Sequence, residues 1–449
     1  LAARGVRFTS AYCNSPICIP ARATFATGQY IHRVGYWDNG DPYEGSVTSW
    51  HHRLRGAGRA VDSIGKLHFR STADDNGFRR EYIPLHVVEG LGDLMGLVRD
   101  DLPVRGGSYK IAKSAGPGES EYTAYDRQIT AEAIRWLREE APRSGDEPWT
   151  LFVSWVCPHF PLTAPQRFFD MYPLDRLPWP KQYAKDERPR HPYLCDYAGS
   201  LNYDDYFDEE KVRVATAAYY ALCTFLDDNI GQVLGALDDA GYGGSTRIMY
   251  TSDHGDNLGA RGLWGKSTMY EETAAVPLIL AGPDLPEDVT CRTPVSHVDC
   301  YPTFLGAGGV ALTEPERAYP GRSLFDIVHG ATPRRNVFSE YHAMGSTTGA
   351  FMIRNGKYKF VHYPKYAPQL FDLEADPEEL CDLGENTDYA KVRAECEMLL
   401  RRICDPEEVD ARAKRRQAEQ VAKHGGREAV IARGDLGYSP PPGHKPDFR

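Results

Sequence analysis

The chain has 449 residues, 41% of them hydrophobic, so it is long enough to bury the core of one large domain plus a smaller unit. Its formal net charge of -11 argues against nucleic acid or an anionic membrane as partner, because both need a basic surface. No run of eighteen apolar residues and no signal peptide is visible, so we expect no membrane span.

The first predicted elements place a cysteine at the start of a short helix. Residues 1–12 read as the last turn of a helix that leads into a strand. In "NSPICIPARATFATG" (14–28), Pro20 suits the first helical position and Gly28 the position after the last. Cys18 then lies near the helix N-terminus, where backbone N–H groups lower a thiol pKa and attract an anion. Cys18 as a small buried hydrophobe is the alternative.

Farther along, strands alternate with helices. Apolar runs predict strands at 60–65, 149–156, 246–252 and 276–282, and amphipathic patterns predict helices at 126–141 and 209–241. This alternation predicts an α/β fold with a mainly parallel sheet sandwiched by helices. Ligands bind beyond the carboxyl ends of such strands. We therefore expect one edge of the sheet to gather the polar residues that follow these strands: Lys66, His68, His159, Asp253 and His254.

The pattern changes after residue 330. Short alternating strands at 351–363 and 368–379, then a helix ending near Cys404, predict a smaller antiparallel sheet with a helix. We divide the chain into a catalytic α/β domain (1–330), this subdomain (331–404) and a charged tail (405–449) that forms no core of its own. The ten cysteines form no short-spaced zinc pairs and no dense disulfide framework, which favours a reducing, cytoplasmic compartment.

Several short motifs together resemble one family. The strings "CIPAR", "GKLHF" (65–69), "PHFP" (158–161), "SDHGD" (252–256) and "GKSTMYEE" (265–272) follow the order and spacing of type I sulfatases and phosphonate monoester hydrolases. These belong to the alkaline phosphatase superfamily, and the chain resembles most the choline-sulfatase and phosphonate-hydrolase branches. Each string alone is a weak signal, since Asp and Gly in "SDHGD" also favour turns. The full ordered set covers nearly the whole chain.

The resemblance implies a modified nucleophile. In the family, a formylglycine-generating enzyme oxidises the cysteine matching Cys18 to an aldehyde, whose hydrate supplies the attacking oxygen. The second hydroxyl then allows the covalent ester to collapse and release sulfate. The resemblance assigns roles to the remaining matched residues: Arg22 holds the diol, Lys66 and Lys266 bind the anion, His68 is the base, His159 serves the leaving oxygen, and Asn39 contacts the substrate. Asn39 as a turn residue beside Gly40 stays open.

A divalent metal is also implied by the resemblance. Asp253, His254 and the modified Cys18 would be ligands, and a hard ion is expected: Ca²⁺ first, with Mn²⁺ or Mg²⁺ as alternatives. The family also uses two adjacent aspartates after its first strand. Here the adjacent pairs follow no buried strand: Asp74-Asp75, Asp100-Asp101, Asp204-Asp205, Asp227-Asp228 and Asp238-Asp239. We expect that the segment carrying the family's pair lies upstream of Leu1.

The leading hypothesis is a sulfuric-ester hydrolase for a small aryl or alkyl sulfate. A phosphonate monoester or phosphodiester hydrolase with the same nucleophile is an alternative, as is a metal-deficient binding protein. Glu340, Tyr341 and the aromatic loop 193–207 either frame a pocket for a cationic leaving group or are surface residues. The tail resembles arms that dock on neighbouring subunits, so we expect a homo-oligomer.

Overall fold

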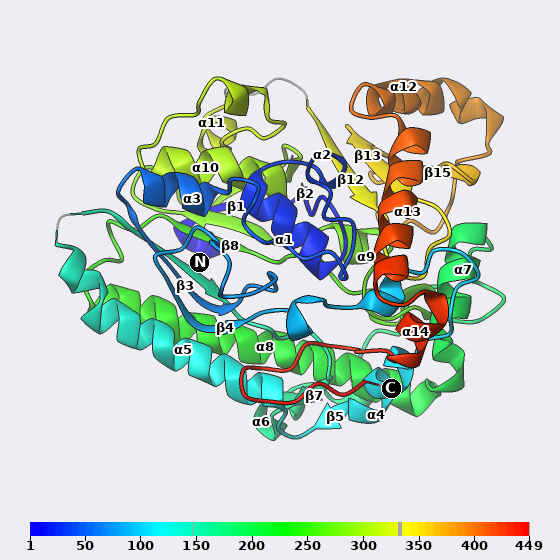
Figure 1. Ribbon diagram of the computed structural model, residues 1–449, viewed down its shortest axis with the longest axis horizontal. Helices are drawn as coiled ribbons and strands as arrows, with labels where there is room; N and C mark the ends of the chain where they lie inside the picture. The colour runs from blue at the N-terminus through cyan, green and yellow to red at the C-terminus, as the bar shows by residue number, and fades with distance from the viewer. Residues whose placement is uncertain (146, 331–334, 449) are drawn as a thin grey trace.

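A three-stranded parallel sheet forms the centre of the main body. The computed structural model describes residues 1–145, 147–330 and 335–448 (Figure 1). In the central sheet, β3 (Ala60–Lys66) lies between β4 (Arg80–Leu85) and β6 (Trp149–Ser154), and all three run parallel. The carboxyl ends of β3 and β6 therefore meet at one edge.

A second, mixed sheet completes the main body. Its order is β10 (Val289–Cys291), β1 (Gly5–Phe8), β9 (Leu278–Ala281) and β8 (Ile248–Thr251). The strand β1 runs parallel to β10, whereas β9 runs antiparallel to both β1 and β8. Two short parallel pairs are also present: β2 (Ala11–Tyr12) with β11 (Val295–Ser296), and β5 (Gly116–Pro117) with β7 (Thr163–Ala164). The four predicted strands exist. Of these, β3 and β6 belong to the parallel sheet, whereas β8 and β9 belong to the mixed sheet.

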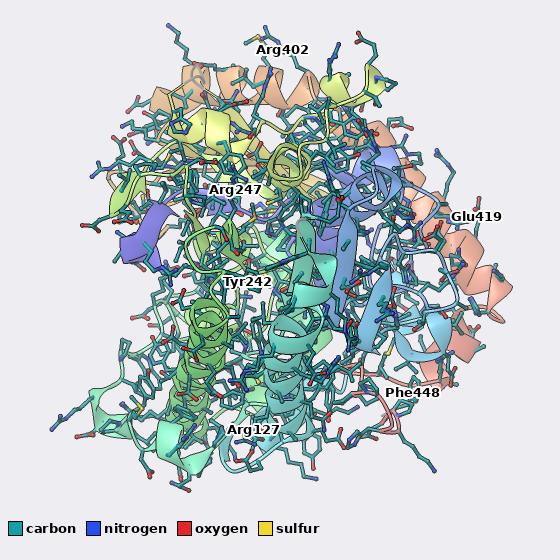
Figure 2. All side chains as sticks on the ribbon, turned by 90° about the vertical axis from the view of Figure 1, so that its left-hand side faces the viewer. Arg127, Tyr242, Arg247, Arg402, Glu419 and Phe448 are labelled. Carbon is teal, nitrogen blue, oxygen red and sulfur yellow. The ribbon has the colours of Figure 1, made fainter. Side chains whose placement is uncertain are left out.

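Helices cover the central sheet on both faces (Figure 1). The long helices α5 (Glu121–Glu139) and α8 (Glu209–Asp239) run side by side on one face (Figure 2). The other face carries α1 (Cys18–Thr27), α3 (Trp50–Gly56) and α10 (Cys300–Ala307). Shorter helices are α2 (Ile31–Val34), α4 (Gly107–Ser114), α6 (Gln166–Phe169), α7 (Pro192–Leu201), α9 (Glu271–Ala274) and α11 (Leu324–Val328). The predicted α/β sandwich is confirmed.

The helix α1 begins two residues earlier than the proline pattern indicated. Cys18 is its first residue, so Pro20 is the third helical residue and not the first. A proline is tolerated there, because the first N–H groups of a helix have no intrahelical acceptor. Gly28 ends the helix with φ of 68°, and a Cβ there would lie 2.5 Å from the Tyr301 side chain. Only glycine fits that close approach.

The C-terminal part contains the predicted antiparallel sheet. Its order is β12 (Asn336–Tyr341), β13 (Ala350–Asn355), β14 (Tyr358–Tyr363) and β15 (Tyr366–Asp372), and α12 (Ala390–Arg401) packs on β13 and β14. Buried side chains from strands and helix share one apolar cluster, among them Phe338, Phe351, Phe360 and Leu400. The predicted boundary at 330/331 borders residues 331–334, which lie outside the described residues.

The tail folds back on the same chain. It contains α13 (Pro406–Lys423), whose Asp405 side chain caps the helix, and α14 (Arg427–Ala432). One face of α13 is buried: Val409 and Ala413 join the C-terminal apolar cluster, and Gln417 bonds to Asp38. The role of the tail as an oligomerisation arm stays a prediction. No described helix combines the length and the apolar character that a membrane crossing requires.

Candidate active site

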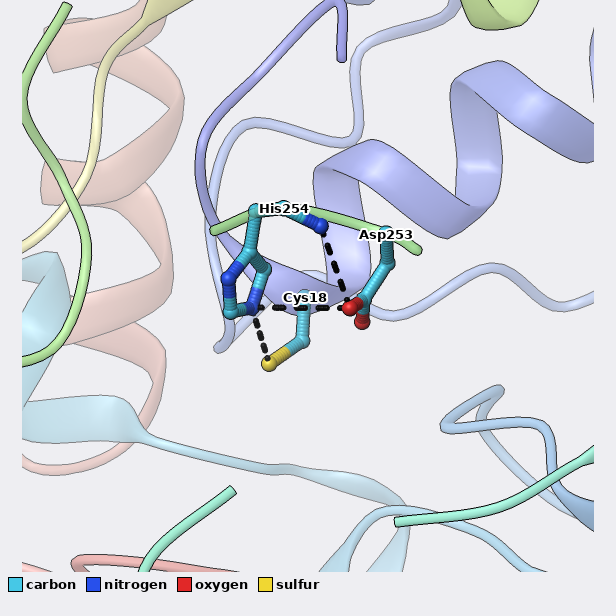
Figure 3. A group of neighbouring side chains, drawn as sticks. All are labelled: Cys18, Asp253 and His254. Atoms are coloured by element: carbon cyan, nitrogen blue, oxygen red, sulfur yellow. Dashed lines mark hydrogen bonds and ion pairs between the residues drawn. The ribbon is translucent and has the colours of Figure 1, made fainter. Parts of the chain in front are cut away.

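The start of α1 brings Cys18 against two residues that follow β8 (Figure 3). The Cys18 Sγ lies 3.2 Å from the His254 Nε2. One ligand atom each from Cys18, Asp253 and His254 falls within 4.8 Å of the others, and this is the group among the described residues that could hold a metal ion. Residues about 235 positions apart in sequence meet here because the first residue of α1 lies against the segment that follows β8.

The donor atoms of this group fit a divalent cation. The His254 Nδ1 contacts the Gly255 carbonyl oxygen at 2.8 Å, so Nδ1 carries the proton and Nε2 presents its lone pair toward Cys18. The Asp253 Oδ2 accepts from the Arg22 Nε at 3.0 Å, while its Oδ1 lies 3.8 Å from the His254 Nε2. A carboxylate oxygen beside a free imidazole nitrogen is a suitable partial ligand set.

Two further predicted residues, Lys266 and His159, lie beside Cys18. The Lys266 Nζ lies 3.0 Å from the Cys18 Sγ and 3.1 Å from the His159 Nε2. The His159 Nδ1 contacts the Phe160 carbonyl oxygen at 2.7 Å, so its Nε2 accepts from Lys266. Asp256, within the "SDHGD" motif, accepts the Gly265 N–H at 3.0 Å and so holds the loop that carries Lys266.

The end of β3 supplies Lys66 and His68. The Arg22 Nη1 donates to the Lys66 carbonyl at 2.8 Å and to the Ser154 hydroxyl at 3.1 Å, which ties α1 to β3 and β6. His68 has φ of 58°, an uncommon backbone conformation outside glycine that clusters at functional sites. Both side chains are buried and line the same cavity as Cys18.

Burial and positive charge set the protonation states of the site. Burial alone would raise the pKa of the Cys18 thiol, but the positive charges of Lys266 and Lys66 hold it well below its usual range. Burial lowers the pKa of His68 to about 4, and burial with the neighbouring Lys266 and Lys66 lowers that of His159 to about 3. Both imidazoles are therefore neutral at neutral pH. In a chain of net charge -11, this local cationic cluster is suited to bind an anion.

A small cavity of about 80 Å³ opens onto these residues. All of the predicted catalytic residues except Arg22 line it, and so does Asn39. The Asn39 Oδ1 accepts the Ile19 N–H at 3.1 Å, so this side chain caps the start of α1 as well as facing the cavity. Aromatic side chains make up much of the remaining lining: Tyr122, Phe160, Tyr197, Tyr203 and Tyr438.

The structure also positions residues that the motifs did not single out. Asp126 on α5 accepts the N–H groups of Val156 and Cys157 and so holds the loop that carries His159. Ser439, near the end of the chain, contacts the His68 Nε2 at 2.9 Å. Asp126 could have been noticed as a carboxylate on the apolar side of a predicted helix. Nothing in the sequence around Ser439 marks it.

Glu340 and Tyr341 neither frame a pocket for a cation nor lie on the surface, whereas Tyr197 and Tyr203 of the aromatic loop line the cavity. The Glu340 carboxylate is fully buried and bonded to His32 at 2.9 Å and His342 at 3.0 Å. The Tyr341 hydroxyl donates to the Met344 carbonyl at 2.7 Å. Neither residue lines the cavity, because β12 directs both into the core. Each adjacent aspartate pair named above includes an exposed residue, and none joins the metal-ligand group.

Comparison with known proteins gives consistent matches. The sulfatase family model matches residues 1–310, and the model of the N-sulphoglucosamine sulphohydrolase C-terminal region matches residues 259–407. The chain is 34% identical over 398 residues to the choline-sulfatase of Rhizobium meliloti (strain 1021), covering 86% of this chain and 77% of that protein. Arylsulfatase K of Danio rerio is 29% identical, over 93% of this chain and 80% of that protein.

Solved structures share the fold. The phosphonate monoester hydrolase from Silicibacter pomeroyi superposes with a TM-score of 0.71 at 23% identity, covering 89% of this chain and 88% of that one. The phosphonate monoester hydrolase of Agrobacterium radiobacter gives a TM-score of 0.70 at 22% identity, with 90% and 89% covered. At these identities the likeness establishes the architecture alone.

Proposed function

This chain belongs to the sulfatase family, and we propose that it cleaves a small aryl or alkyl sulfate with formylglycine at position 18 and a divalent metal ion. The observation that carries the proposal is the placement of Cys18 in one buried site with Lys266 at 3.0 Å and His254 at 3.2 Å. A hydrated aldehyde at position 18, next to a cation, would supply a nucleophilic oxygen at neutral pH.

The residues around the cavity would divide the work by their charge and location. Lys66 and Lys266 would bind the non-bridging oxygens of the ester, whose negative charge grows as the bond to the leaving oxygen breaks. Arg22 neutralises Asp253 and fixes the start of α1 relative to β3. Their positive charges would be preorganised, since each side chain is held in a largely buried position.

The two histidines would handle protons. His68 is neutral above about pH 4 and can accept a proton from a hydroxyl at position 18. The His159 Nε2 accepts a hydrogen bond from Lys266 in the resting site. When the ester bond breaks, Lys266 of this pair can donate that hydrogen bond to the leaving oxygen instead. Asp253, His254 and the modified Cys18 would hold the metal ion, which would lower the pKa of a bound hydroxyl. Ca²⁺ is the expected ion, with Mn²⁺ or Mg²⁺ as alternatives.

Mass spectrometry tests the modification. After co-expression with a formylglycine-generating enzyme, the peptide with Cys18 should carry an aldehyde in place of its thiol. A Cys18→Ala variant should lose activity on an aryl sulfate, whereas Cys13→Ala, which removes a buried thiol outside the cavity, should keep it. An unmodified Cys18 in a fully active enzyme would disprove the proposal.

A phosphonate monoester or phosphodiester substrate is the second candidate, because the cationic cluster binds tetrahedral sulfur and phosphorus esters alike. Paired assays of an aryl sulfate and an aryl phosphonate monoester divide the two. A protein that binds sulfate but hydrolyses neither ester would be a non-catalytic binding protein. A cytoplasmic location stays a prediction, and so does homo-oligomerisation through the tail. If a variant without residues 405–449 sediments with an unchanged number of subunits, the tail is not the oligomerisation arm.

A further inference from the structure

One wall of the cavity is built by the C-terminal end of the same chain. The segment Asp435–Ser439, here named the wall segment, contributes all five of its residues to the cavity lining. Asp435, Leu436 and Ser439 are buried, and Tyr438 is half-buried. In Figure 1 the red chain after α14 runs across the lower part of the main body, turns back and ends near α4. The site is therefore closed by residues about 420 positions away from Cys18.

The wall segment is anchored at its first residue. The Asp435 Oδ1 accepts from the Arg105 Nη2 at 2.6 Å, and its Oδ2 accepts from the Gly107 N–H at 2.8 Å. Arg105 is itself buried and also bonds to Asp93 at 2.7 Å. The Lys110 Nζ donates to the carbonyl oxygens of Asp435 and Leu436. A buried charged pair with further hydrogen bonds fixes this end to α4.

The last residue of the wall segment is anchored in the site itself. The Ser439 hydroxyl contacts the His68 Nε2 at 2.9 Å, and the Ser439 carbonyl accepts from the Tyr122 hydroxyl at 2.6 Å. With both ends held, Gly437 turns the chain between them at φ of 69°. The intervening Tyr438 is thus presented to the cavity from a fixed backbone.

Tyr438 completes a set of aromatic rings beside His159. Its ring meets Tyr122 edge to face at a centroid distance of 5.1 Å and Phe160 at 5.9 Å. Phe160 in turn stacks on the His159 ring at 4.4 Å. Flat rings in edge-to-face arrangement offer apolar surfaces that suit another flat ring. The leaving group of an ester held at Cys18 would emerge next to His159 and meet these surfaces.

We propose that the wall segment selects the leaving group, with Tyr438 as the specificity-determining residue that admits a single aromatic ring and excludes a fused bicyclic one. The proposal rests on the proposed function for the placement of the ester. It goes beyond it, because the selecting surface lies in a segment outside every motif of the catalytic domain. Tyr438 lines the cavity beside Tyr122 and Phe160, so its ring bounds the space next to His159 and its removal would widen that space.

Unreactive sulfonates test this without requiring turnover. Calorimetry would measure the binding of inorganic sulfate, benzenesulfonate and naphthalene-2-sulfonate to the full chain. Wild type should prefer benzenesulfonate to naphthalene-2-sulfonate. In Tyr438→Ala the affinity ratio should move toward the bicyclic probe by about tenfold, the usual effect of resizing an apolar pocket. The affinity for inorganic sulfate should change less than about twofold, because the anion contacts are retained.

Three further variants separate specificity from folding. Tyr438→Phe keeps the ring and should keep the wild-type ratio. Asp435→Ala releases the anchor and should shift the ratio in the same direction as Tyr438→Ala. Tyr206→Ala, at an exposed tyrosine that does not line the cavity, is the matched control and should leave all three affinities unchanged.

The outcomes distinguish this proposal from the proposed function. The role of the wall segment is overturned if Tyr438→Ala leaves the affinity ratio of the two sulfonates unchanged, or if Tyr206→Ala shifts that ratio equally. A wild type that binds none of the probes overturns it as well. A wild type that binds the probes but hydrolyses no sulfate or phosphonate ester overturns the proposed function instead, and the affinity ratio still decides the role of Tyr438.

Discussion

Replacement of Asp126 by alanine tests how α5 positions the loop that carries His159. The Asp126 carboxylate is fully buried and accepts the Val156 N–H at 2.8 Å and the Cys157 N–H at 2.9 Å. Asp126→Ala leaves two buried amide donors without acceptors, at a cost of about 1–3 kcal/mol each. We therefore expect the free energy of unfolding to fall by about 2–6 kcal/mol, measured by urea denaturation.

A matched control is available on the neighbouring helix. Asp227 on α8 is exposed, so Asp227→Ala should change the free energy of unfolding by less than about 0.5 kcal/mol. Because the loop held by Asp126 carries His159, the Asp126→Ala variant should also lose most of its activity at temperatures where it remains folded. A stability loss for Asp126→Ala no larger than that of the control would refute the reasoning.

The pH dependence of the same site has a defined sign. Burial raises the pKa of Asp126 from 3.8 to about 6. Between these values the folded state binds more protons than the unfolded state, so this carboxyl contributes a stability that falls as pH rises from about 4 to about 6 and is constant above. Asp126→Asn cannot titrate there. The stability of wild type relative to this variant should therefore decrease across that window, and an increase would contradict the assignment.

Three further predictions concern charge. Lys266→Met should reduce kcat/KM for an aryl sulfate by about 10²–10³, because it removes a positive charge 3.0 Å from the Cys18 Sγ, and a loss below about tenfold would contradict this. Glu340→Ala should destabilise the fold by about 3–5 kcal/mol in calorimetry, because it leaves His32 and His342 without their buried partner; an unchanged Tm would contradict it. Ca²⁺ at about 100 times its Kd should stabilise the metal-free protein by about 2.7 kcal/mol in thermal unfolding, and Asp253→Asn should abolish most of that shift; an equal shift in the variant would exclude this metal site.

Local patterns along the chain predicted most of the secondary structure. The predicted helices at 126–141 and 209–241 correspond to α5 and α8, because their apolar residues recur at helical spacing and α8 starts with a capping aspartate. The strand at 60–65 corresponds to β3, in which Val61 and Ile64 are buried although Asp62 and Ser63 stand between them. These signals involve residues within one turn or one pleat of each other, so they can be recognised without knowledge of the fold.

Strand polarity could not be predicted in the same way. An apolar run at 276–282 identifies β9 as buried, but whether it runs parallel or antiparallel to β1 depends on the path of the intervening chain. The failure at Glu340 has a related cause. A carboxylate beside aromatic residues suggested a cation pocket or a surface position, but the orientation of β12 against α2 buries Glu340 against His32.

The sequence by itself determined the family, because motifs in a fixed order identify it whatever the fold's details. Cys18, Lys66, His159 and Lys266 were all recognisable in this way. Only the tertiary structure showed that Ser439 contacts His68 and that Tyr438 closes the cavity. Such contacts join segments hundreds of residues apart, and they form through packing, which leaves no periodic or local trace in the sequence.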